Sequence, residues 1–192
     1  MSEQFWWHLT RASGIVAWLM LTALVLWGIV LATDLFPEHR RPAWLLAAHR
    51  WLAWLSLGFV GVHVAALVAD NYVAFGIADI LVPFASDWKP APVAVGVLAM
   101  WGLVAVQASS LARRHLSKRT WRGIHLASYA SYWLASLHGT FAGTDANNRL
   151  YVLTSVTTLG AVVFAGSYRV LTRSRRPMRP LGGREPATTV TP

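Results

Sequence analysis

The sequence contains no cysteine and few charged residues. Its 192 residues include no Cys, only 13% are charged, and 55% are hydrophobic. Without cysteine the chain can form no disulfide, hold no thiolate-ligated iron–sulfur cluster, and attach no heme through sulfur. A charged fraction so low, with so much apolar sequence, argues against an ordinary soluble domain.

The apolar residues fall into five long blocks, each close to the roughly 20 residues that a helix needs to cross a bilayer. The blocks cover residues 12–33, 43–69, 91–112, 120–142 and 150–171. We therefore predict an all-α integral membrane protein, a bundle of about five transmembrane helices surrounded by lipid. Residues 72–84 are apolar but too few to span, and we expect them to lie at the membrane interface.

The basic residues flank these blocks, so the net charge of +9 indicates membrane orientation rather than binding to nucleic acid. The side with more Lys and Arg is expected to be cytoplasmic, which places the amino terminus outside and the carboxyl terminus in the cytoplasm. Residues 1–11 are then a short extracytoplasmic segment. Residues 172–192, rich in Arg, Pro and Thr, are predicted to form a disordered cytoplasmic tail.

Four histidines lie inside the predicted spans. His49 and His63 are 14 residues apart in the second block, and His125 and His138 are 13 apart in the fourth. Fourteen residues correspond to about 21 Å and nearly four turns, so one histidine falls in each leaflet. Because the second and fourth spans run parallel, His49 is level with His125, and His63 with His138. An imidazole from each side is the arrangement that gives a low-spin heme iron its two axial ligands, so the two pairs predict two b-type hemes.

One spacing resists this interpretation, because 13 residues on an ideal helix place His125 and His138 roughly 140° apart. Tilt or local distortion must absorb the difference. The alternatives are histidines that bond to serines across helices, or a transition-metal or proton-relay site. Zinc fits less well, since ligand pairs in separate leaflets cannot close one tetrahedral site.

Several other residues could support a heme. Arg50 and Arg122 lie beside the cytoplasmic histidines, where guanidinium groups could pair with heme propionates, although snorkelling to the interface explains them nearly as well. Arg11 and Lys89 are the corresponding candidates on the outer side. Small residues such as Gly58 and Gly61 could admit a macrocycle or allow close helix packing; the sequence does not distinguish these roles.

Three segments of the chain resemble a known family. They are HRWLAWLSLGFVGVHV from residue 49, FGIADILVPFASDWKP from residue 75, and WRGIHLASYASYWLASLHGTFAGTD from residue 121. Together with the histidine spacing, they are similar to small prokaryotic members of the ferric reductase-like transmembrane domain family. That family includes NADPH oxidases, ferric reductases and the heme-binding subunit of the methionine sulfoxide reductase system. The resemblance covers residues 11 to 170 approximately.

The resemblance implies that His49 and His125 ligate an inner heme and His63 and His138 an outer heme, in a prokaryotic plasma membrane. Oxidases and ferric reductases continue into a domain that binds FAD and a nicotinamide nucleotide. Here only residues 172–192 follow the fifth block, and no Gly-x-Gly-x-x-Gly motif follows a predicted strand. We therefore expect no FAD or NAD(P) site in this chain.

The predicted function is transmembrane electron transfer through two b hemes, as an oxidoreductase component. A separate flavoprotein reductase or quinol would be the donor, and the acceptor would be extracytoplasmic. One alternative is a self-standing ferric-chelate reductase. Another, from a different class, is a non-redox membrane scaffold or transporter whose histidines hold helices together or relay protons.

Overall fold

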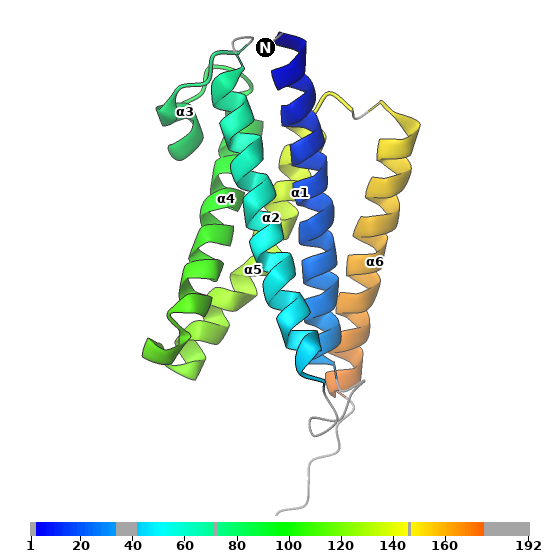
Figure 1. Ribbon diagram of the computed structural model, residues 1–192. Coiled ribbons are helices and arrows are strands. Elements are labelled where there is room, and N and C mark those ends of the chain that lie inside the picture. Colours follow the sequence, from blue (N-terminus) through cyan, green and yellow to red (C-terminus); the bar gives the residue numbers. More distant parts are fainter. Residues whose placement is uncertain (1–2, 34–41, 71–72, 146, 175–192) are drawn as a thin grey trace, which may run out of the picture.

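Six α-helices and one 3-10 turn make up the part of the chain that the computed structural model describes, residues 3–33, 42–70, 73–145 and 147–174 (Figure 1). These residues contain no strand, so the all-helical prediction is confirmed. The elements in chain order are α1 (Glu3–Ala32), α2 (Ala43–Ala69), α3 (Ile77–Leu81), α4 (Pro90–Leu111), the 3-10 turn η2 (Arg113–His115), α5 (Lys118–Ala142) and α6 (Arg149–Ser174).

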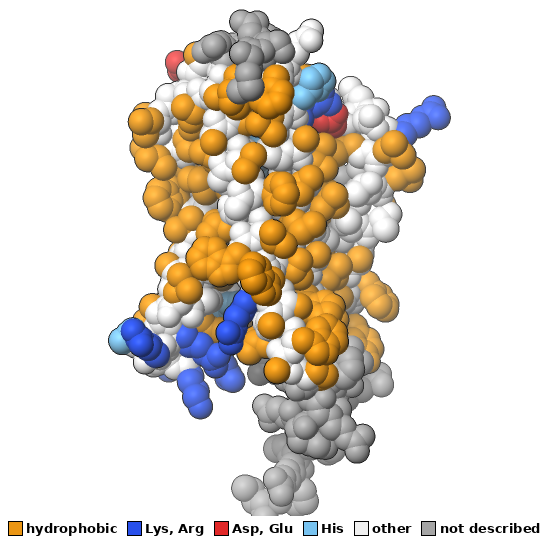
Figure 2. Space-filling model, in the orientation of Figure 1, with side chains coloured by type: hydrophobic (Ala, Val, Ile, Leu, Met, Phe, Trp, Pro, Cys, Tyr) orange, Lys and Arg blue, Asp and Glu red, His pale blue; other side chains and the backbone are white. Residues whose placement is uncertain are grey.

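Four of these helices, α1, α2, α4 and α6, are long and apolar enough to cross a membrane. The fourth predicted block forms α5, a helix of 25 residues that is not among those four because its composition is more polar. Hydrophobic side chains cover much of the face of the bundle shown in Figure 2. Large apolar residues are exposed elsewhere too, among them Phe164, which is 74% exposed. Such a surface is compatible with contact to lipid.

Some predicted boundaries were wrong. Helix α1 begins at Glu3 rather than at residue 12, so most of the predicted separate segment 1–11 is helical. Helix α6 continues to Ser174, which makes residues 172–174 helical rather than the start of a tail. Residues 175–192, the rest of that predicted tail, lie outside the described residues. The predicted interfacial segment 72–84 contains the five-residue helix α3.

Local sequence explains where α4 and α5 begin. Pro90 and Pro92 occupy the first turn of α4, where a missing N–H removes no helical hydrogen bond. Lys89, just before it, has a left-handed backbone with φ of 43°. Ser117 caps α5, since its Oγ accepts a hydrogen bond from the backbone N–H of Thr120 at 3.1 Å. The prolines therefore mark the start of α4, and the Ser117 cap marks the end of the turn between α4 and α5.

The helices pack chiefly as two antiparallel pairs. Helix α1 lies along α2, and α4 lies along α5, while α6 lies against α1 (Figure 1). Helix α5 follows an oblique course behind α1 and α2. At Gly102 of α4 a Cβ atom would come within contact distance of the Ser131 side chain, so a glycine permits this close approach to α5.

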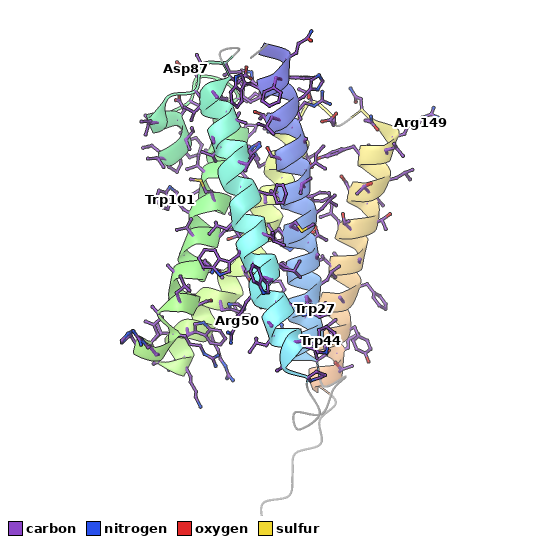
Figure 3. All side chains as sticks on the ribbon, in the orientation of Figure 1. Trp27, Trp44, Arg50, Asp87, Trp101 and Arg149 are labelled. Atoms are coloured by element: carbon purple, nitrogen blue, oxygen red, sulfur yellow. The ribbon has the colours of Figure 1, made fainter. Side chains whose placement is uncertain are left out.

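Charged side chains separate between the two ends of the bundle. The carboxylate end, where α1 begins, contains every acidic side chain that the structure describes: Asp70, Asp79, Asp87 and Asp145. Asp87 and Arg149 mark this end in Figure 3. The opposite, basic end contains Arg50, Arg113, Arg114, Lys118, Arg119, Arg122 and Arg169. Figure 2 shows lysine and arginine side chains gathered there.

The main hydrophobic core joins α1, α5 and α6. Tyr132 of α5 is completely buried there, against Leu21, Val25 and Ile29 of α1 and Val162 of α6. The Tyr132 hydroxyl has no hydrogen-bond partner within the described residues. A buried, unpaired hydroxyl lowers stability, whereas the ring itself contributes through packing.

We expect Tyr132→Phe to leave the thermal unfolding temperature of the detergent-purified protein unchanged or raised, because the substitution removes an unpaired hydroxyl and keeps the ring. Tyr132→Ala should destabilise by about 3–5 kcal/mol, because it leaves a cavity. The matched control is Phe164→Ala, at a site that is 74% exposed and should cost little. A loss in Tyr132→Phe as large as in Tyr132→Ala would contradict this view of the core.

Candidate functional site

The four histidines of the predicted spans meet as two pairs across the space between α2 and α5. The ring centroids of His49 and His125 are 6.3 Å apart, and those of His63 and His138 are 6.4 Å apart. These are the pairs expected from the spacing. The inner pair, His49 and His125, lies toward the basic end, and the outer pair, His63 and His138, lies toward the carboxylate end.

The unequal spacing on the two helices is accommodated by the course of α5. Helix α5 is continuous from Lys118 to Ala142, so no break rotates one histidine relative to the other. It crosses α2 obliquely instead (Figure 1). When two helices cross at an angle, the face of one that meets the other changes along its length. His125 and His138 therefore both reach α2 although they occupy different faces of α5.

The outer imidazoles are each fixed by a backbone carbonyl on a neighbouring helix. Nδ1 of His63 is 2.8 Å from the carbonyl oxygen of Thr10 on α1, and Nδ1 of His138 is 2.9 Å from that of Pro92 on α4. A carbonyl oxygen can only accept, so Nδ1 carries the proton and donates. This leaves the lone pair on Nε2 of both rings, the nitrogen that can bind a metal.

Glycines on the neighbouring helices make room for three of the four rings. A Cβ at Gly96 would lie 2.5 Å from Nδ1 of His138, and one at Gly14 would lie 3.0 Å from the His63 ring. At Gly28 it would lie 3.3 Å from the His49 ring. In contrast, a Cβ at Gly58 or Gly61 would meet nothing within 4 Å, so these two glycines do not make room for the histidines.

The inner pair lies in a cavity of about 1220 Å³ that is lined by residues of α1, α2, α4, α5 and α6. This volume exceeds the roughly 300–1,000 Å³ usual for ligand sites. Nδ1 of both His49 and His125 is shielded from solvent and has no hydrogen-bond partner within the described part of the chain. The inner rings thus lack the carbonyl contacts that hold the outer rings.

Four arginines line this cavity. Arg50 and Arg122, the two expected from the sequence, are joined by Arg113 and Arg169. Nη1 of Arg169 donates a hydrogen bond to the Tyr129 hydroxyl at 2.7 Å, which ties α6 to α5 at the cavity wall. A cluster of guanidinium groups beside an apolar cavity can bind the anionic groups of a largely apolar ligand.

Trp121 packs against the imidazole of His125, the inner histidine of α5. Its indole stacks on the His125 imidazole, with centroids 5.0 Å apart and planes inclined by 22°. The guanidinium carbon of Arg113 lies 4.4 Å from the centroid of the same indole. Arg113 and His125 therefore both contact the Trp121 indole, which orients a ring that has no hydrogen bond at Nδ1.

The cations expected near the outer pair are engaged by protein groups. Arg11 forms an ion pair with Asp145, its Nε lying 3.0 Å from Oδ2, and it also lies over the Trp7 ring. Lys89 donates to the carbonyl oxygens of Phe141 and Ala142, at 3.1 Å and 3.3 Å, at the end of α5. At the carboxylate end, the first contact ties α1 to the loop after α5, and the second ties the start of α4 to the end of α5.

The separation of each pair suits two imidazoles bound to one metal ion. Two metal–nitrogen bonds of about 2.0–2.1 Å each, plus a ring radius of about 1.1 Å on both sides, give about 6 Å between centroids. The observed 6.3 Å and 6.4 Å agree with this sum. Among the residues described, no group of three or more His, Cys, Asp or Glu is placed to hold a metal ion.

Most of the supporting groups were not predicted from the sequence. The contacts at Thr10 and Pro92 are made by backbone carbonyls, so the side chains at these positions did not indicate them. Gly14 and Gly28, however, are 14 residues apart on α1, the same spacing as His49 and His63 on α2. That match between adjacent antiparallel helices is a signal that could have identified them.

Comparison with protein-family models, with curated proteins and with solved structures found no match to this chain.

We expect Gly96→Ala to displace His138, because the added Cβ would lie 2.5 Å from its Nδ1. Overpacking of this kind costs about 1–3 kcal/mol. Thermal unfolding of the detergent-purified protein should therefore show a lower midpoint. Gly61→Ala, where a Cβ meets nothing within 4 Å, is the matched control and should be neutral or slightly stabilising. Equal stability of the two variants would contradict the assigned contact.

Proposed function

We propose that this chain is a heme-binding membrane protein of the ferric reductase-like kind, which carries electrons across the bilayer. His49 and His125 would hold an inner b-type heme, and His63 and His138 an outer one. The observation that carries this proposal is the pair of nearly equal separations, 6.3 Å and 6.4 Å, between imidazoles of α2 and α5, two helices that run in the same direction.

Each pair offers two imidazoles and therefore suits a metal whose remaining ligands come from a cofactor. A heme held by such a pair would supply one-electron transfer. The chain's own groups prepare the outer site, since the carbonyls of Thr10 and Pro92 fix the tautomer that leaves Nε2 free. At the inner site the cavity of about 1220 Å³ has room for a macrocycle.

The arginines of the inner cavity have a defined role in this proposal. Arg50 and Arg122, both lining the cavity, would bind the propionates of the inner heme by charge-assisted hydrogen bonds. Arg113 and Arg169 line the same cavity and extend this set. A carboxylate in the cavity would neutralise part of a positive cluster for which the described residues provide no acidic partner at the basic end.

The topology proposed with this function has five membrane spans, with α5 as the fourth, in a prokaryotic plasma membrane. The basic end would face the cytoplasm, as the positive-inside rule predicts, and the amino terminus would lie outside. A separate flavoprotein reductase or a quinol would reduce the inner heme. The electron acceptor would be extracytoplasmic, on the side of His63 and His138, the residues that would hold the outer heme.

The first test is the reduced-minus-oxidised absorption spectrum of the detergent-purified protein, with the number of hemes per chain. We expect split low-spin b-type bands from two hemes, with His63→Ala and His125→Ala each removing a different one. His8→Ala, at an exposed histidine outside the pairs, is the matched control and should keep both.

The same measurement separates the rival functions. A protein that stays colourless after reconstitution with heme would overturn the proposal and favour a non-redox scaffold or transporter. If two hemes are present, steady-state reduction of ferric chelates by the isolated protein with a chemical donor would instead identify a self-standing ferric-chelate reductase.

A further inference from the structure

A second, smaller cavity lies at the basic end, at the turn that joins α4 to α5. Its volume is about 480 Å³, and its lining residues are Arg113, Arg114, Leu116, Lys118 and Trp121. We call it the basic groove. Because the apolar helix α4 ends at Leu111, two residues before the groove begins, the groove lies where a hydrocarbon core would meet the head-group region.

The groove concentrates positive charge. Arg113, Arg114 and Lys118 line it, and none of the acidic residues that the structure describes lies at this end of the bundle. The groove also adjoins the start of α5, where the positive end of the helix dipole adds to the side-chain charges. The site therefore favours an anion more strongly than isolated surface cations would.

One lining residue leaves a hydrogen-bond donor unused. Nε1 of Trp121 is shielded from solvent and has no acceptor among the described residues. Shielded donors of this kind normally have a partner. Trp121 lines the inner cavity as well as the groove, so the acceptor would come from a ligand in either place. Apolar surface adjoins the same place, since Leu116 lines the groove and the Leu111 side chain just before it is 63% exposed.

We propose that the basic groove binds the phosphate head group of an anionic membrane lipid. Arg114 and Lys118 would contact the phosphate oxygens, with Arg113 beside them against the Trp121 indole, and the acyl chains would lie along the exposed apolar side chains that begin at Leu111. The combination of three cations with adjoining apolar surface at the end of a span fits a lipid better than a free phosphate ion, which needs no apolar contact.

Bound lipid would lie next to the inner histidine pair. Arg113 and Trp121 line both the groove and the inner cavity, and the Trp121 indole stacks on the His125 imidazole. A head group in the groove would therefore contact residues that also surround the inner histidine pair. This binding goes beyond the proposed electron transfer and needs no heme, so it can be tested separately.

The test is native mass spectrometry of the full-length, detergent-purified protein with added phosphatidylglycerol or phosphatidylcholine. We expect the protein to retain phosphatidylglycerol selectively. The double variant Arg114→Gln/Lys118→Gln should weaken that binding by at least tenfold, since each cation near the membrane surface contributes about fivefold.

The matched control is Arg119→Gln/Arg149→Gln, which removes the same charge from two residues that do not line the groove. Both variants keep residues 175–192, so any binding by that basic sequence cancels in the comparison. Unfolding midpoints without added lipid establish that the two variants fold equally well.

Loss of selectivity in the control as large as in the groove variant would overturn the proposal, as would equal retention of both lipids by the wild type. Inorganic phosphate provides a further comparison. If it binds in the groove as tightly as phosphatidylglycerol, the site is a phosphate site and not a lipid site. None of these outcomes depends on whether the protein contains heme.

Discussion

Each outer imidazole is held by a carbonyl oxygen on the adjacent helix, at a place where a glycine leaves space for the ring. The accepting residue precedes the glycine by one helical turn in both cases, Thr10 before Gly14 and Pro92 before Gly96. A side chain at the glycine would push the imidazole away from the carbonyl. The contact therefore ties α1 to α2 and α4 to α5, and it orients the His63 and His138 rings that meet between the two helix pairs.

The two histidine pairs use the same residue type but have different surroundings. The outer rings donate from Nδ1 to backbone carbonyls, which orients them and makes Nε2 a stronger ligand. The inner rings have no such contact at Nδ1, and His125 is oriented by Trp121 instead. Four arginines line the inner cavity, whereas Arg11 and Lys89 near the outer pair bind protein groups. Two cofactors held here would experience different electrostatic environments.

The sequence was sufficient to predict the helices and the pairing of the histidines. Hydrophobic blocks located α2 at residues 43–69, and the spacing of histidines on two parallel helices indicated which rings would meet. It was not sufficient for contacts made by backbone atoms. Every residue of a helix has a backbone carbonyl, and only the packing of α1 and α4 determines that those of Thr10 and Pro92 accept the hydrogen bonds.

The start of α1 was misjudged for a different reason. Polar residues such as Glu3 and Arg11 were excluded from the apolar block, although they continue the same helix beyond it. Arg11 is retained there by its ion pair with Asp145 and by the ring of Trp7. Hydrophobicity marks the part of a helix that suits lipid, whereas the helix itself ends where capping and tertiary contacts end.

Hydropathy also fails to identify α5 as a helix that could cross a membrane. Averaging over all faces makes α5 too polar to count among the apolar helices, but lipid contacts only the face that other helices leave open. Its polar residues include the two histidines that meet α2, and its Ser131 and Tyr132 are buried against neighbouring helices. Because His125 and His138 lie level with His49 and His63, α5 extends over the same depth as α2, which is an apolar helix long enough to span. This correspondence supports the proposal that α5 also crosses the membrane, with its polarity directed into the bundle.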